Sequence, residues 1–146
     1  MKGYLIDPEK RTVEAVEVGD TIQDIYDHIQ ADTFDCVRMP NDDTIYVDDE
    51  GLFRKHDYFT LVGYQSPLAG RGLVLGTDHE GNSVDPVQTL EELARQVMFI
   101  STSEAINMAE SMDEIGRERE KTHGPGYIYV PVAGILKDAA YTKSPK

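Results

Sequence analysis

The stretch "GRGLVLGTDHEGNSVDP", residues 70–86, places a fully apolar run beside a segment rich in turn-forming residues. Residues 73–75, Leu-Val-Leu, are typical of a buried strand. Residues 78–82 have the composition of a turn, and residues 83–85 form a returning strand that Pro86 ends. The stretch therefore predicts a β-hairpin.

The glycines of this stretch match a phosphate-binding loop only in their spacing. Such a loop lies between a strand and a helix, so that amide groups at the helix N-terminus meet the phosphate. Gly70, Gly72 and Gly76 flank a strand instead, no Gly-Lys-Ser/Thr follows, and the next predicted helix starts at Thr89. We therefore interpret the glycines as sites of a bend or of close approach by another part of the backbone.

Metal-binding spacings are missing from the sequence. The oxygen-bearing side chains between residues 78 and 85 do not follow the register of a calcium loop. The four histidines lie in separate segments, without the paired spacing of a zinc site. Cys36 is the only cysteine, which excludes an intrachain disulfide. The sequence predicts no metal and no cofactor.

Two further hairpins are predicted upstream of this stretch. The first joins strands at residues 3–6 and 12–18, and the second joins strands at residues 33–39 and 44–47. Turn-forming residues such as Pro, Asn, Asp and Gly separate the strands of each pair. Residues 58–62 have the composition of another strand.

Apolar residues at helical spacing predict three helices, over residues 21–30, 89–100 and 101–120. The last two begin with capping boxes, in which Thr or Ser precedes Glu by three residues: Thr89 with Glu92, and Ser101 with Glu104. Residues 127–132 follow as an extended apolar segment. These features place most of the predicted helical structure in the C-terminal half of the chain.

Together the elements predict an α+β fold. We expect a mainly antiparallel sheet of about five strands, with the helices at 21–30 and 89–100 packed on one face. Residues 1–100 are predicted to form this core domain. Residues 101–146 are predicted to add a helical segment and an extended tail, packed on the core or on a partner.

Charge limits the classes of partner. The 146 residues include 27 Asp and Glu against 14 Lys and Arg, a formal net charge of −13. A nucleic-acid-binding protein needs the opposite sign, so direct binding of DNA or RNA is not expected. No apolar run approaches the ~20 residues that span a membrane, and the N-terminus does not match a signal peptide. We therefore expect a cytoplasmic protein without membrane contact.

The acidic residues are concentrated between residues 14 and 50, where Arg38 is the single cation. Such a one-signed field either keeps a protein soluble or steers a basic partner. The candidate contacts for a partner lie in two acidic turns: Asp42, Asp43, Asp48, Asp49 and Glu50.

Four segments of the chain, two of which contain these acidic turns and part of the 70–86 stretch, resemble a known family. The N-terminal hairpin, the helix around Ile25, "DCVRMPNDDTIYVDDEG" (35–51) and "PLAGRGLVLGTDHEG" (67–81) together resemble a small family from phages and mobile elements, known as a domain of unknown function. The resemblance covers about residues 3–100. It implies an origin in a phage or plasmid, and since the family has no established activity, it assigns no functional residue.

The leading hypothesis is a non-enzymatic phage or plasmid accessory protein that binds a host protein, such as an anti-defence inhibitor with a phosphate-like acidic surface. Because no nucleophile motif is present, catalysis is the less favoured interpretation. One alternative is a protein that binds a small ligand or nucleotide derivative, with or without hydrolysing it, in a pocket formed by Tyr58, Phe59, Tyr64 and Gly72. A second alternative is a virion or assembly component that self-associates through residues 102–132.

Overall fold

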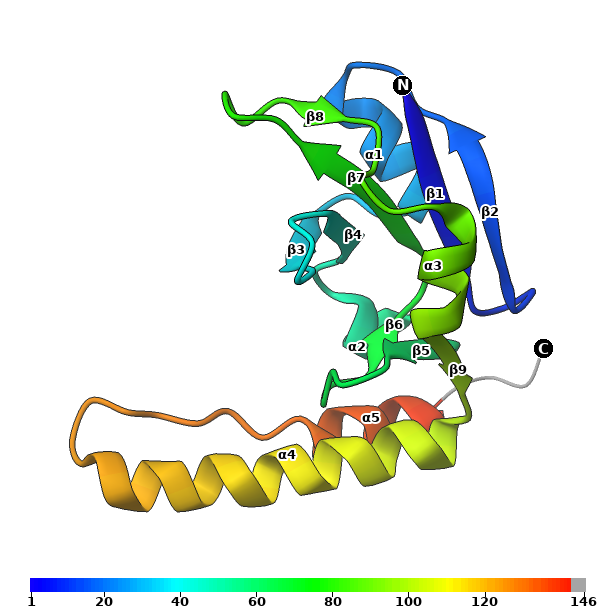
Figure 1. Cartoon of the computed structure of the whole chain (residues 1–146). Coiled ribbons are helices and arrows are strands. Elements are labelled where there is room, and N and C mark those ends of the chain that lie inside the picture. Colours follow the sequence, from blue (N-terminus) through cyan, green and yellow to red (C-terminus); the bar gives the residue numbers. More distant parts are fainter. Residues whose placement is uncertain (143–146) are drawn as a thin grey trace.

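The protein is described here by a computed structural model that covers residues 1–142, so the end of the predicted C-terminal tail lies outside the described residues. Its larger sheet has six strands in the order β2-β1-β7-β4-β3, with β8 paired to β7 (Figure 1). All pairings are antiparallel. The strands are β1 (Lys2–Asp7), β2 (Thr12–Glu17), β3 (Phe34–Arg38), β4 (Thr44–Asp48), β7 (Gly72–Thr77) and β8 (Ser83–Val84).

The hairpin predicted from residues 70–86 is confirmed and lies at the centre of this sheet. β7 pairs with β1 on one side and β4 on the other, and Gly76 and Thr77 pair with β8. The glycines permit close packing, as expected. A Cβ on Gly72 would lie 2.8 Å from Phe59 Cζ, and a Cβ on Gly76 would overlap the carbonyl oxygen of Asp85.

A second, three-stranded sheet has the order β6-β5-β9. Its strands are β5 (Tyr58–Leu61), β6 (Leu68–Ala69) and β9 (Val97–Ile100). The helix predicted over 89–100 was therefore too long: α3 (Leu90–Gln96) ends where β9 begins. Val97 and Met98 continue the helical apolar spacing, but this β-branched and aromatic run pairs with the whole length of β5 instead.

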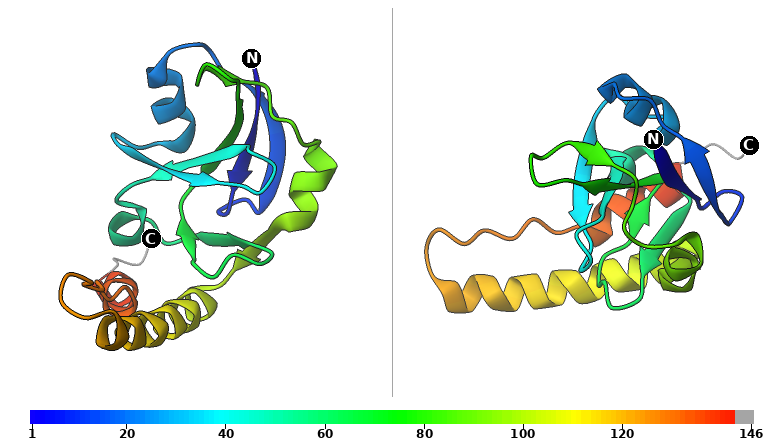
Figure 2. Two further views of the ribbon diagram at one scale, coloured as in Figure 1. Left: turned by 60° about the vertical axis from the view of Figure 1, so that its left-hand side comes forward. Right: turned by 45° about the horizontal axis from the view of Figure 1, so that its top comes forward.

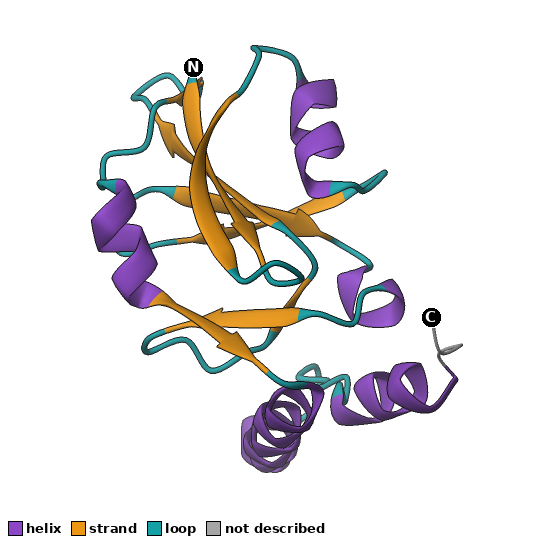
Figure 3. Cartoon of the chain, turned by 90° about the vertical axis from the view of Figure 1, so that its right-hand side faces the viewer, coloured by secondary structure: helices purple, strands orange, loops and turns teal. Residues whose placement is uncertain are grey.

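The two faces of the larger sheet are covered by different elements (Figure 3). Ile25 and Ile29 of α1 (Ile22–Ile29) pack against Leu73 and Leu75. Val74 points the opposite way, because neighbouring residues of a strand alternate in direction, and it joins the core that contains α3 and the smaller sheet. The α+β antiparallel fold is confirmed, but α1 and α3 do not share one face as predicted.

The C-terminal helices pack beneath the smaller sheet. α4 (Thr102–His123) and α5 (Ala133–Thr142) lie side by side, next to the short helix α2 (Gly51–Arg54) (Figures 1 and 2). Both predicted capping boxes are formed, at the start of α3 and of α4. The cluster that joins α4 and α5 to the sheet consists of Tyr58, Ala69, Ile100, Ala105, Ala109, Ala133 and Leu136.

The far end of α4 and the chain that returns from it project beyond the rest of the molecule (Figure 2). We call residues 113–132, which comprise this end of α4 and the returning segment, the arm. Among the described residues, no helix combines the length and the apolar character needed to cross a membrane.

Candidate functional site

The structure removes two of the five predicted partner contacts from the surface. Asp43 is 0% exposed, and its carboxylate accepts hydrogen bonds from the main-chain N–H groups of Val87 (2.8 Å) and Gln88 (3.2 Å) and from Gln88 Nε2 (3.0 Å). These bonds tie the turn before β4 to the segment before α3. Asp43 is therefore a structural residue, contrary to the prediction.

Asp48 is also internal, and the other three predicted contacts are exposed. Arg54 Nη2 donates to both oxygens of the buried Asp48 carboxylate, to Oδ1 at 3.1 Å and to Oδ2 at 3.2 Å. Asp42, Asp49 and Glu50 remain at the surface, with Asp42 3.5 Å from Arg38. The prediction that a partner contacts these three residues stays a prediction.

The ligand pocket predicted around Tyr58, Phe59, Tyr64 and Gly72 is not formed. Tyr58 and Phe59 are consecutive in β5, so their side chains enter different cores on opposite faces of the strand. Gly72 is buried against the Phe59 ring, and Tyr64 alone is exposed. Adjacent strand residues cannot line one cavity, which is the reason that this prediction was wrong.

Tyr64 instead borders a groove between the β5–β6 loop and the arm. The groove has a volume of about 280 Å³, and its walls include Met112 and Ile115 of α4 and Tyr127 and Tyr129 of the returning segment. Apolar and aromatic side chains from three separate parts of the chain thus meet at the base of the arm.

A single buried carboxylate holds the returning segment and the start of α5 in place. Asp113 Oδ1 accepts hydrogen bonds from Tyr129 Oη (2.7 Å) and the Val132 N–H (2.8 Å), and Oδ2 accepts one from the Ala133 N–H (3.0 Å). The negative charge also lies at the N-terminus of α5, where the helix dipole favours it. Asp113 therefore fixes the chain where it turns back toward the core.

The ring of Tyr129 lies flat against α4 at Gly116. Any Cβ at position 116 would overlap this ring, so the contact requires glycine. Nearer the tip, Glu120 Oε2 accepts a hydrogen bond from the Tyr129 N–H (2.8 Å), and the rings of His123 and Tyr127 stack with centroids 4.9 Å apart. The inner side of the returning segment is thus ordered against α4.

These contacts shift the ionisation of the anchoring pair. Burial opposes the charge of Asp113, but hydrogen bonds from Tyr129, Val132 and Ala133 outweigh it and hold the pKa of this carboxyl below its usual value. Burial, together with the hydrogen bond to Asp113, raises the pKa of Tyr129 to about 12. At neutral pH the pair is therefore a phenol donating to a carboxylate.

The outer side of the returning segment has no cover. Ile128 is 82% exposed and Val130 is 70% exposed, while the tyrosines between and beside them face α4. In the described part of the chain, the main-chain N–H groups of Ile128 and Val130 have no hydrogen-bond partner. The sequence Tyr-Ile-Tyr-Val has strong strand propensity. The segment is an extended, strand-forming chain without a neighbouring strand.

Comparison with protein families places most of the chain. Residues 1–98 match the family model described as "Domain of unknown function (DUF3846)". The chain belongs to the DUF3846 family. The matched DUF3846 region ends inside β9, so α4, the arm and α5 lie outside it. Neither the curated proteins nor the solved structures contain a significant match to the chain.

Sequence reasoning found the arm only in part. Residues 127–132 were predicted to be extended, and the path of the chain in Figures 1 and 2 agrees with this. Self-association through residues 102–132 was one alternative and stays a prediction. Asp113 was missed because an acidic side chain is ordinarily expected on the exposed face of a helix. The signal that could have revealed it is the spacing of Ala105, Ala109, Asp113 and Gly116, four small or short side chains along one face of the helix.

Proposed function

We propose that this DUF3846 protein is a non-enzymatic protein-binding domain whose arm adds a strand to an extended segment of a partner protein. The observation that carries the proposal is the returning segment itself, ordered on its inner side and unpaired on its outer edge, with Ile128 and Val130 exposed. An unpaired strand-forming edge is a template for another chain. Main-chain hydrogen bonds supply affinity in such pairing, and alternate side chains supply specificity.

Apolar burial supports the same surface. Single exposed apolar residues are common on protein surfaces. Here two of them, Ile128 and Val130, occupy alternate positions on one side of a projecting segment. Burying an aliphatic side chain of this size contributes about 1.5–3 kcal/mol. Ile128 and Val130 together therefore account for a substantial part of a micromolar binding free energy, which is about 8 kcal/mol.

Charge favours a basic partner over a second copy of the chain. Two copies would each bring a net charge of −13, and this repulsion opposes self-association. A basic segment is attracted by the same field, to which the exposed Asp42, Asp49 and Glu50 contribute. The sequence-based expectation of a host protein as partner, for a protein carried by a phage or plasmid, is part of this proposal.

The test compares matched variants of the full chain. Ile128→Asp combined with Val130→Asp is expected to abolish retention of a specific bacterial protein that the wild type retains at low salt. Val87→Asp is the control, because Val87 is similarly exposed (75%) but lies before α3. The retained protein is then identified, purified and titrated against each variant, and the control is expected to bind like the wild type.

A main-chain substitution separates strand addition from simple apolar contact. Val130→Pro removes the N–H of residue 130 while keeping an apolar side chain, and it is expected to weaken binding as strongly as Val130→Asp. Equal binding by wild type and the double Asp variant would contradict the proposal. Dimerisation is measured by analytical ultracentrifugation. If the wild type dimerises with rising concentration and the double variant does not, the partner is a second copy of the chain and not a basic protein.

A further inference from the structure

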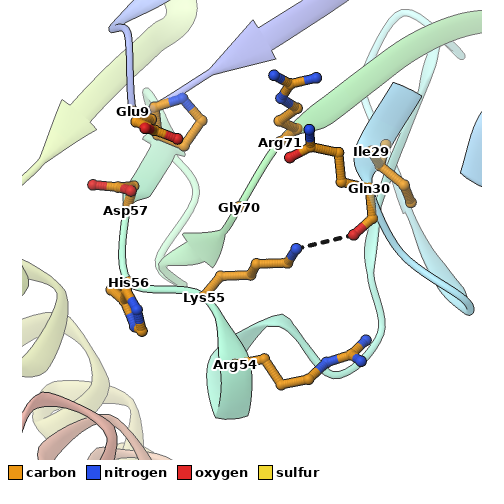
Figure 4. Close-up of a pocket in the computed structure, with 10 residues that line it drawn as sticks. Glu9, Ile29, Gln30, Arg54, Lys55, His56, Asp57, Gly70 and Arg71 are labelled. Carbon is orange, nitrogen blue, oxygen red and sulfur yellow. Dashed lines mark hydrogen bonds between the residues drawn. The ribbon is translucent and has the colours of Figure 1, made fainter. Parts of the chain in front are cut away.

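A small pocket away from the arm is lined by three cationic side chains and by the carboxylates of Glu9 and Asp57 (Figure 4). It has a volume of about 200 Å³ and lies where four segments meet: the β1–β2 turn, the end of α1, the end of α2 with the chain after it, and the two residues before β7. Arg54, Lys55 and Arg71 all line it. These segments are distant in sequence, so the cluster exists only in the folded chain.

Buried carboxylates hold both arginines. Arg71 Nη2 lies 3.5 Å from Asp7 Oδ2, and Arg71 Nη1 lies 3.4 Å from the main-chain oxygen of His28 at the end of α1. Arg54 is held by Asp48, as described above. Asp7 and Asp48 are both nearly inaccessible to solvent, and they neutralise and orient the guanidinium groups of Arg71 and Arg54.

Lys55 has a different environment. Its ammonium donates to the main-chain oxygen of Gln30 at 2.9 Å, and among the described residues no carboxylate lies within 4.0 Å of it. The stem of Lys55 crosses Gly70, where a Cβ would lie 2.9 Å from Lys55 Cγ. Gly70 also has a φ of 80°, so glycine is required there for two reasons. Within the part of the chain that the structure describes, Lys55 is thus a cation held by one hydrogen bond and without an ionic partner.

Donor capacity is left over in this arrangement. An ammonium group has three N–H donors and a guanidinium group has five. In the folded chain, one donor of Lys55 is used by Gln30, and Nη1 and Nη2 of Arg71 contact His28 and Asp7. We propose that this pocket binds the phosphate group of a small phosphomonoester. Phosphate carries a charge of about −1.5 to −2 at pH 7, so Lys55 attracts it more strongly than it attracts a singly charged carboxylate.

The size and the opposite wall of the pocket define the rest of the ligand. Pockets for drug-sized ligands measure about 300–1,000 Å³, so a volume of about 200 Å³ fits a phosphate with a few further atoms and not a whole nucleotide. Glu9 and Asp57 lie on the other side of the pocket from Gln30 (Figure 4). These acceptors suit hydroxyl groups on the non-phosphate end of the ligand.

The experiment is an NMR titration of the ¹⁵N-labelled full chain with inorganic phosphate, glycerol 3-phosphate and acetate at constant ionic strength. Saturable shifts are expected at the amides of Gln30, Gly70 and Arg71. Glycerol 3-phosphate is expected to bind more tightly than phosphate, and acetate more weakly than either. Lys55→Gln is expected to raise the dissociation constant about tenfold or more, because a charged hydrogen bond is lost.

Lys10→Gln is the matched control, since Lys10 lies in the β1–β2 turn and its side chain makes no ion pair within the described residues. It removes the same charge without touching the pocket and is expected to leave binding unchanged. Shifts that do not saturate, or an equal loss of affinity in Lys55→Gln and Lys10→Gln, would overturn the proposal. Tighter binding of acetate than of phosphate would overturn the assignment to phosphate. All outcomes are independent of the arm.

Discussion

The DUF3846 region and the arm are stabilised in different ways. The central strand of the family region is covered on both faces by aliphatic and aromatic side chains, among them Ile25, Phe59 and Leu93. The buried face of α4 carries Ala105, Ala109, Asp113 and Gly116, and the arm is fixed at one carboxylate. The sheet domain therefore depends on apolar burial, whereas the position of the arm depends on a few directional contacts.

The largest expected effect comes from the centre of the sheet. Leu73→Ala removes a fully buried side chain by which β7 packs against α1 and is expected to destabilise the whole chain by about 2–5 kcal/mol. Chemical unfolding followed by circular dichroism measures the loss. Ile115→Ala on the partly exposed face of α4 is the control, and it is expected to cost far less. A similar loss in both variants would contradict the contrast between the two regions.

The next effect is local. Asp113→Asn removes the charge and replaces one acceptor by a donor facing a main-chain N–H, which costs about 1–3 kcal/mol. Hydrogen exchange followed by mass spectrometry is expected to speed up in residues 127–138 and stay unchanged in β1, β4 and β7. Faster exchange throughout the large sheet would show that the arm and the domain unfold together.

Acid should have the same effect as Asp113→Asn in the wild type. The pKa of Asp113 is lowered in the folded chain, so its contribution is complete above the unfolded value of about 3.9 and is lost as the pH falls through the lower folded value. Asp113→Asn is expected to lack this acid-induced release.

The smallest expected effect is that of Tyr129→Phe. Loss of the hydrogen bond to Asp113 is expected to cost about 0.5–1.5 kcal/mol at neutral pH. The pKa of Tyr129 is raised to about 12, so the wild-type contribution is complete below the unfolded value of about 10 and disappears as the pH rises through 12. Exchange rates of the arm measured for the two proteins between pH 9 and 12 should differ at pH 9 and converge as the pH rises from 10 to 12. A constant difference over this range would argue against the assigned pairing.

Local features of the sequence predicted local structure well. The hairpin at 70–86 and the capping boxes at Thr89 and Ser101 depend on residues a few positions apart, and all three are confirmed. The end of α3 was missed because Val97 and Met98 fit a helical stripe, and only pairing with β5 turns them into a strand. Propensity could not reveal that partner.

The candidate site was predicted less well for a similar reason. Asp43 and its hydrogen-bond partner Gln88 are 45 residues apart in sequence. Nothing near Asp43 or Asp48 distinguishes a buried acceptor from the exposed Asp42 and Asp49 beside them. Charge composition predicts a field, but which carboxylates reach the solvent depends on contacts that are formed only in the folded chain.

The short junction between β9 and α4 connects the arm mechanically to the smaller sheet. Ser101 is the single residue between the strand and the 22-residue helix, which is about 33 Å long. A load applied near the tip therefore acts on the cluster that joins α4 to the smaller sheet, in which Ile100 of β9 and Tyr58 of β5 take part. Any ligand that restrains the tip is expected to slow hydrogen exchange in β5 and β9, far from the point of contact.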